Sequence, residues 1–219
     1  MEAVDEAAGA GPVIRRGVPA GAEDRVAQLY WEAFGRKLGP ALGPPDRGRA
    51  FLAAHLHRDR AVVALDAGRV VGVAGYHLAG RALTGGDAAA VLAAYGVLRG
   101  LPRLALLSLL ERRPADGQLL MDGIAVDPDW RGRGVGGRLL TEIARVAAAH
   151  DCREIRLDVV DTNPRARRLY ERHGFVALST EHTPYLRRLL GFGAVTTMRR
   201  GVGRSPGGRS GDRPECRYR

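Results

Sequence analysis

The spacing of apolar side chains divides this chain into short segments with either strand-like or helix-like patterns. Apolar runs bounded by turn residues predict strands over 13–18, 61–65, 69–77, 118–126, 154–159, 175–179 and 194–198. Apolar positions three or four residues apart predict helices from Glu23, from Asp46 to about Arg58, and over 135–149. A break over Gly39–Pro45 separates the first two helices. The pattern therefore predicts a mixed α/β protein with about seven strands and flanking helices.

One long segment and the two ends do not follow this alternation. Residues 83–117 are rich in Ala and Leu and predict a helical insertion, with helices around 87–98 and 102–112. The insertion is either a packed structural element or a substrate lid or dimer surface. Residues 1–12 and 201–219 predict a disordered N-terminus and a flexible basic tail. We therefore expect a single domain over 13–200.

The composition narrows the class of partner. The net charge is +10, but Lys37 is the only lysine, the arginines are scattered and aromatic residues make up 5% of the chain. This pattern argues against a nucleic-acid-binding stripe. The N-terminus lacks the features of a signal peptide, and no apolar run reaches the length of a membrane span. We expect a cytoplasmic protein without a metal site, because Cys152 and Cys216 lack metal-ligand spacing.

The segment Arg131–Arg138 carries the first clear chemical signal. Four of its eight residues are glycines, and it lies between a predicted strand and a predicted helix. Glycines let the backbone approach an anion closely, and the free N–H groups and dipole of a helix N-terminus favour negative charge. The segment therefore predicts a site for a phosphorylated ligand.

Two common phosphate-binding motifs fit this segment poorly. A Walker-type loop requires a lysine, and none is near. A dinucleotide fingerprint is formally present at Gly132, Gly134 and Gly137, with Asp158 placed as a ribose-binding acid. However, residues 127–131 separate the strand from the first glycine, and too few strand–helix units follow Asp158 to complete a doubly wound sheet.

A third interpretation uses two motifs together. The motif Arg131-x-x-Gly134-x-Gly136 follows the end of a predicted strand, Ile124 to Val126. A second motif, Asn163-Pro164-x-Ala166-x-x-x-Tyr170, begins a segment that ends at Phe175. These residues resemble the cofactor half of the GNAT family of N-acetyltransferases. The resemblance implies the GNAT acyl-CoA N-acyltransferase fold, with a mostly antiparallel sheet splayed between its fourth and fifth strands.

The resemblance also implies a co-substrate, acetyl-CoA, and the residues that bind it. The glycine loop would bind the pyrophosphate, the fourth strand would pair with the pantetheine arm, and the second motif would contact the same arm. The Ile124 backbone N–H is a candidate for the oxyanion of the tetrahedral intermediate. The cofactor-binding residues expected from the resemblance are Ile124, Ala125, Val126, Arg131, Gly132, Arg133, Gly134, Val135, Gly136, Gly137, Arg138, Asn163, Ala166 and Tyr170.

Two residues are candidates for catalysis. The tyrosine that matches Tyr170 protonates the departing thiolate in the family, although Tyr170 could also be the packed face of a short helix. Asp122 is the candidate general base, with a loop-ordering or cation-binding role as the alternative. His77 is a weaker candidate for the base. Arg138 could equally be a solvated surface residue.

The implied activity is direct acetyl transfer, in a ternary complex, to a primary amine of a small-molecule or peptide acceptor. The alternative from another class is a non-catalytic acyl-CoA-binding sensor of the same fold, which would keep the glycine loop but not the acid and base. Dimers are frequent in the family, so a homodimer is one expected assembly.

Overall fold

All seven predicted strands join one sheet, in the order β1-β2-β3-β4-β5-β7-β6. The computed structural model describes residues 11–110, 114–184 and 187–203, and the expectations for 1–10 and 204–219 lie outside these ranges. β4 and β5 run parallel, and the other neighbouring pairs are antiparallel. The strands are β1 (Val13–Arg16), β2 (Ala61–Asp66), β3 (Arg69–His77), β4 (Gln118–Val126), β5 (Glu154–Val160), β6 (Val176–His182) and β7 (Ala194–Gly201).

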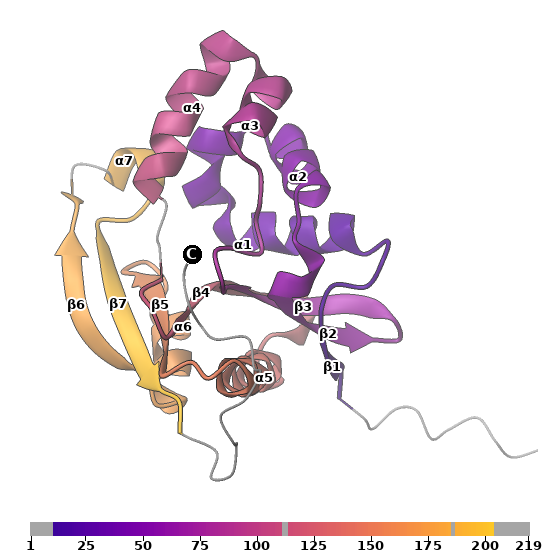
Figure 1. Cartoon of the computed structure of the whole chain (residues 1–219), viewed down its shortest axis with the longest axis vertical. Helices are drawn as coiled ribbons and strands as arrows, with labels where there is room; N and C mark the ends of the chain where they lie inside the picture. The colour runs from indigo at the N-terminus through magenta and orange to yellow at the C-terminus, as the bar shows by residue number, and fades with distance from the viewer. Residues whose placement is uncertain (1–10, 111–113, 185–186, 204–219) are drawn as a thin grey trace, which may run out of the picture.

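Helices cover both faces of the sheet (Figure 1). One face carries α1 (Glu23–Leu42) and α2 (Pro45–Ala54), above which stand α3 (Ala88–Tyr95) and α4 (Val97–Leu110). The opposite face carries α5 (Val135–Ala149) and α6 (Pro164–Arg172). The short elements are η1 (Arg58–Arg60), η2 (Pro128–Trp130) and α7 (Arg187–Leu190).

This arrangement produces two apolar cores, one on each face of the sheet. Val62 and Ala64 of β2 pack in the core beneath α5, whereas Ala61 and Val63 pack in the core beneath α1. Successive side chains of a strand point to opposite faces. β2 is therefore apolar at consecutive positions because both of its faces are covered.

The first helix continues through the predicted break. α1 includes Gly39 and Pro40 and ends at Leu42. Proline removes one helical hydrogen bond, but Ala41 and Leu42 are buried in the core of the helical face. The N–H of Gly43 donates to the Gly39 carbonyl at 2.8 Å and closes the last turn. Here packing outweighs the local preference of the sequence for a break.

The second helix is shorter than predicted. α2 begins at Pro45, with Pro44 rather than Asp46 at the N-cap, and ends at Ala54. Leu56 instead forms an isolated bridge with Thr84, and η1 follows. This tertiary pairing ends the helix before Arg58.

The insertion forms two helices, as expected, but their boundary differs. Gly96, at φ +74°, ends α3, and α4 runs from Val97 through Pro102. Asp87 caps α3 by accepting a 2.8 Å hydrogen bond from the Ala90 N–H. The positive φ of Gly96 therefore sets the break, which lies before the gap between 98 and 102 that the sequence predicted.

Candidate functional site

The sheet opens between β4 and β5. Their pairing covers only Gln118–Leu120 against Glu154–Arg156, although β4 continues to Val126. Beyond Leu120 the two strands separate, which confirms the splay expected from the family resemblance. Over 121–126 the β5-facing edge of β4 has no strand partner among the described residues, so its backbone groups can pair with an extended ligand.

The predicted anion site lies at the N-terminus of α5. Gly134 is the N-cap residue, at φ +77°, and Gly132 has φ +78°. Both are exposed, and a Cβ at either would meet no atom within 4 Å. The glycines are therefore needed for backbone conformation, and the space above them is open to a ligand. The first N–H groups of α5 have no acceptor within the helix.

Of the other residues of this turn, some pack against the protein interior and some lie at the surface. Val135 is buried in the core, so only its backbone is available to a ligand. Gly136 and Gly137 pack against α6, because a Cβ there would lie 3.0 Å from the Leu169 side chain and 2.8 Å from the His173 ring. Close contact between α5 and α6 therefore explains both glycines.

The three arginines of the loop are exposed. Arg131 Nε donates to the Val126 carbonyl at 3.1 Å, and the Arg133 guanidinium lies 5.1 Å from the centre of the Trp130 ring. Arg138 lies in the first turn of α5, where its backbone N–H donates to the Gly134 carbonyl. Arg131 and Arg133 are therefore positioned by the chain itself, and their remaining donors face solvent.

The second predicted motif forms the start of α6. The Asn163 side chain accepts a 3.1 Å hydrogen bond from the Ala166 N–H, and Pro164 occupies the first helical position. Asn163 is therefore the N-cap of α6. Both Asn163 and the start of α6 remain accessible, since Asn163 is exposed and Ala166 half-buried.

Tyr170 lies on the buried face of α6. Its ring packs against Phe175, with ring centres 5.9 Å apart, in the core beneath α5. Burial raises the pKa of the Tyr170 phenol to about 12. The hydroxyl is therefore protonated at neutral pH and can act as a donor.

Asp122 lies at a β-bulge in β4. The β3–β4 register shifts between Gly75 and Tyr76, which pair with Gly123 and Met121 and leave Asp122 as the extra residue. Its carboxylate accepts a 3.1 Å hydrogen bond from the Leu83 N–H. Burial raises the pKa of the Asp122 carboxyl to about 6, against the opposite effects of this hydrogen bond and of the Lys37 charge.

The sequence analysis missed Tyr30 of α1. Burial raises the pKa of its phenol, and the charges of Asp122 and Tyr170 raise this pKa further. Tyr30 is therefore close enough to both catalytic candidates to sense their charges. Its helical spacing identified Tyr30 only as a core position.

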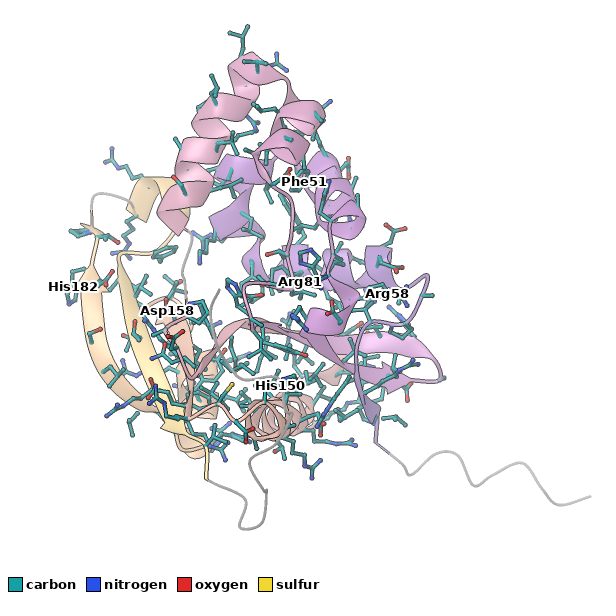
Figure 2. All side chains as sticks on the ribbon, in the orientation of Figure 1. Phe51, Arg58, Arg81, His150, Asp158 and His182 are labelled. Atoms are coloured by element: carbon teal, nitrogen blue, oxygen red, sulfur yellow. The ribbon has the colours of Figure 1, made fainter. Side chains whose placement is uncertain are left out.

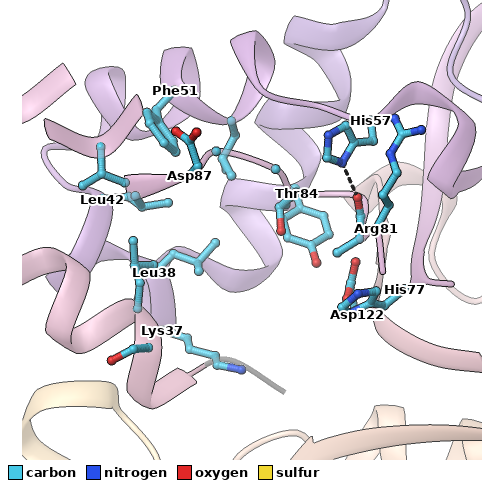
Figure 3. A pocket seen from close by; sticks show the side chains of 18 of the residues that line it. Lys37, Leu38, Leu42, Phe51, His57, His77, Arg81, Thr84, Asp87 and Asp122 are labelled. Carbon is cyan, nitrogen blue, oxygen red and sulfur yellow. Dashed lines mark hydrogen bonds between the residues drawn. The ribbon is translucent and has the colours of Figure 1, made fainter. Parts of the chain in front are cut away.

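A cavity of about 730 Å³ opens beside Asp122. Figure 3 shows Asp122 and His77 at one side, and Leu38 and Phe51 at the other. The volume is in the range of small-molecule sites. Its lining includes residues from the sheet, from α1 and α2, and from the insertion, namely Tyr30, Lys37, Leu38, Leu42, Phe51, His57, His77, Arg81, Asp87, Val91, Leu104, Leu107, Asp122 and Asp158.

Two other charged residues of the cavity were not assigned to it from the sequence. Lys37 lies on α1, and Asp158 lies on β5, where it accepts a 2.7 Å hydrogen bond from the Thr197 hydroxyl. Figure 2 shows Asp158 on the β5 side of the molecule and Phe51 and Arg81 on the side of α1 and α2. The sequence suggested Asp158 only as a ribose-binding acid, and no sequence motif assigns either residue to this cavity.

The described part of the chain has two further properties. It contains no group of three or more His, Cys, Asp or Glu side chains that could hold a metal ion. It also contains no helix long and apolar enough to cross a membrane.

A comparison of the sequence with known protein families agrees with this geometry. The model of the acetyltransferase (GNAT) family matches residues 24–175. The chain therefore belongs to the GNAT family.

Two enzymes that share one name are similar to part of this sequence. Thialysine N-epsilon-acetyltransferase from Bos taurus is 38% identical over 56 residues, which are 26% of this chain and 33% of that protein. The enzyme of the same name from Sus scrofa is 36% identical over 56 residues, with the same coverage. The matched stretch thus spans about a third of the length of these relatives.

Solved structures share the fold over most of the chain. The crystal structure of an acetyltransferase covers 87% of this chain and 100% of its own, with a TM-score of 0.59 and 20% identity. A ribosomal-protein-alanine N-acetyltransferase from Brucella melitensis covers 87% and 99%, with a TM-score of 0.57 and 17% identity. A phosphinothricin acetyltransferase from Sinorhizobium meliloti, in complex with AcCoA, covers 92% and 97%, with a TM-score of 0.56 and 16% identity.

Proposed function

We propose that the protein is an acetyl-CoA-dependent N-acetyltransferase that acts on a primary amine by direct attack in a ternary complex. The observation that supports this proposal is that the splay of the sheet and the cavity lie at the same place. The splay between β4 and β5 begins after Leu120, and the cavity beside Asp122 opens at these same strands. A donor and an acceptor substrate can therefore meet there.

The residues at the start of α5 suit the pyrophosphate of the co-substrate. Gly132 and Gly134 leave open space where side chains would otherwise stand, and the helix N-terminus supplies N–H donors. Arg131, Arg133 and Arg138 are exposed nearby and can add charge-assisted contacts. The unpaired edge of 124–126 can hold the pantetheine amides, and Asn163 and Ala166 flank the same arm.

The chain supplies a group for each proton transfer. Asp122 removes a proton from the acceptor ammonium, directly or through water, which requires the carboxylate form. The Ile124 N–H donates a hydrogen bond to the oxyanion that forms when the amine attacks. Tyr170 donates a proton to the departing thiolate. The new N–C bond replaces the thioester C–S bond, and the second proton lost by the nitrogen restores the Tyr170 phenol. The products are an amide and free CoA.

Replacing Tyr170 with Phe tests this assignment. We expect turnover to fall by about a hundredfold or more, because general acid catalysis contributes roughly 10²–10⁴-fold. The affinity for acetyl-CoA should be unchanged, since the aromatic ring remains. Turnover is measured by release of the free thiol with a broad panel of amines, and affinity by calorimetry.

Tyr76→Phe is the matched control. It also removes a phenol from a buried ring, but the Tyr76 hydroxyl donates to the Asp59 carbonyl at 2.9 Å, away from the splay. This control should keep its turnover. Equal turnover in Tyr170→Phe and the wild type would remove the proton-donor role. A wild type that binds acetyl-CoA but releases no thiol with any amine would support the sensor function instead.

A further inference from the structure

The cavity beside Asp122 has two chemically different ends. At the sheet end, β4 and β5 contribute the carboxylates of Asp122 and Asp158. At the helix end the wall is largely apolar, and Figure 3 shows Leu38, Leu42 and Phe51 across the cavity from Asp122. The insertion completes this apolar end with Val91, Leu104 and Leu107.

Part of the apolar wall is not covered by other protein groups. Leu38, Leu104 and Leu107 are only half-buried, and all three line the cavity. A hydrocarbon group placed against them removes apolar surface from water, which stabilises the complex in proportion to the area buried. The helix end therefore favours an apolar ligand group.

The charged groups around the helix end do not offer a good site for a second ammonium. Lys37, the only lysine of the chain, lines the cavity beside Leu38. Asp87 is exposed, with one carboxylate oxygen accepting the N–H of Ala90 as the cap of α3, so its charge lies on the solvent side of the leucine wall. Arg81 also lines the cavity, and its guanidinium lies 3.5 Å from the Asp59 carboxylate. A cation in the leucine wall would meet the repulsion of Lys37 and lose its hydration.

We propose that the acceptor is a small primary monoamine with a hydrocarbon body. Its amino group lies at the Asp122 end of the cavity, and its body lies against the leucines of α1 and α4. This inference rests on the proposed N-acetyltransferase function and names the substrate class of the same site. In the reaction the amine nitrogen gains the acetyl group, the thioester C–S bond breaks, and Asp122 takes the ammonium proton.

The insertion explains why a small molecule fits better than a folded protein. α3 and α4 stand above α1 and α2, and α4 contributes Leu104 and Leu107 to the cavity wall (Figure 1). The cavity is therefore lined by helices on the side away from the sheet. A compact amine can enter this space more fully than the surface of a folded protein can.

Hexylamine and 1,6-diaminohexane test the proposal because they differ only in the group at the far end. In the wild type we expect kcat/KM for hexylamine to exceed that for the diamine by at least about tenfold, since the second ammonium would lose its hydration against the leucine wall. From butylamine to hexylamine, kcat/KM should rise by about three- to fourfold per methylene group.

Leu107→Glu adds a carboxylate at the apolar end. It should reduce the preference for hexylamine over the diamine by about tenfold or reverse it, because the new carboxylate pairs with the second ammonium. Leu98→Glu is the matched control on the same helix, where Leu98 is 92% exposed and does not line the cavity. This control should keep the wild-type preference. Acetyl-CoA affinity is measured for both variants to confirm that they are folded.

The possible outcomes separate this inference from the function on which it rests. Equal or better turnover of the diamine by the wild type overturns the monoamine proposal, as does the same selectivity in Leu107→Glu and Leu98→Glu. CoA release with spermidine or a peptide but not with hexylamine also overturns it and leaves the N-acetyltransferase function standing. Absence of CoA release with every amine, despite acetyl-CoA binding, contradicts the proposed function itself.

Discussion

At the scale of single residues, Asp122 depends on an irregularity of β4. Strict alternation along the strand would place Ile124 on the same face as Asp122. In the structure Met121 and Ile124 both contact the core beneath α5, because the bulge changes the phase of the strand between them. Gly123 permits this path, since it has φ +153° and a Cβ there would lie 2.3 Å from the Phe34 ring.

The pKa of Asp122 leads to a prediction about activity. With a pKa of about 6, the carboxylate form is lost as the pH falls through 6. We expect kcat/KM to decrease about tenfold per pH unit below 6, and Asp122→Asn to lower turnover at pH 8 by about a hundredfold or more. The pH profile of CoA release in both proteins measures this effect. A wild-type profile that is flat from pH 5 to 8 would contradict the role of Asp122 as the base.

The same substitution has an opposite effect on stability. The carboxyl pKa is about 6 in the folded protein, against about 3.9 in an unfolded chain. Between these values the folded state binds more protons, so the wild type loses stability as the pH rises from 4 to 6. Asp122→Asn removes this loss. Its Tm relative to the wild type should therefore increase from pH 4 to 6 and level off above it, whereas a constant difference would argue against the raised pKa.

At the scale of elements, the entry to α5 is held in place by contacts from the opposite face of the sheet. Asp127 forms an ion pair with Arg25 of α1, and its side chain accepts a 3.0 Å hydrogen bond from the Asp129 N–H. The N–H of Asp127 also donates to the Val71 carbonyl at 2.9 Å. The five residues that separate β4 from the first glycine include η2 and therefore form a fixed connection.

Gly134→Ala tests whether the conformation of this entry serves the co-substrate. Because Gly134 has φ +77°, we expect a loss of about 1–2 kcal/mol in the free energy of unfolding, together with weaker acetyl-CoA binding. Gly68→Ala is the control, since Gly68 has φ +80° in the β2–β3 turn and equally open surroundings. It should lose similar stability and keep its affinity. Equal affinity losses in both variants would contradict the predicted pyrophosphate site.

At the scale of the whole molecule, two parts of the sheet meet at the splay. β1 to β4 pair along most of their length, and β5, β7 and β6 form a second set of paired strands. Only three residue pairs join β4 to β5. The proposed co-substrate site therefore lies where the sheet is least connected.

Hydrogen exchange can detect this difference. We expect acetyl-CoA to slow the exchange of backbone amides in 121–126, because the pantetheine arm occupies the open edge of β4. Amides in 61–66, which pair with both β1 and β3, should change little. Mass spectrometry of peptides from the two segments, with and without acetyl-CoA, measures the change. Equal protection of both segments would indicate a global effect of binding and not occupation of this edge.

The sequence by itself determined the strands, and its resemblance to the GNAT family predicted the cofactor half and the candidate acid and base. The glycine loop and the Asn163 cap depend on local backbone geometry, and Tyr170 was predicted from its spacing to Asn163, all of which a sequence pattern records. The helix boundaries were less predictable, because the burial of Ala41 and Leu42 outweighed the breaking effect of Pro40.

Only the tertiary structure decided the cavity beside Asp122, where we propose that the acceptor binds. Lys37, Asp158 and Leu107 come from distant parts of the chain and meet around one cavity. Their approach depends on helix packing and on the bulge at Asp122, neither of which has a local signature, together with the splay of the sheet. The physical reason is that a cavity is the space left between packed elements, so its shape and charge follow from their arrangement in three dimensions.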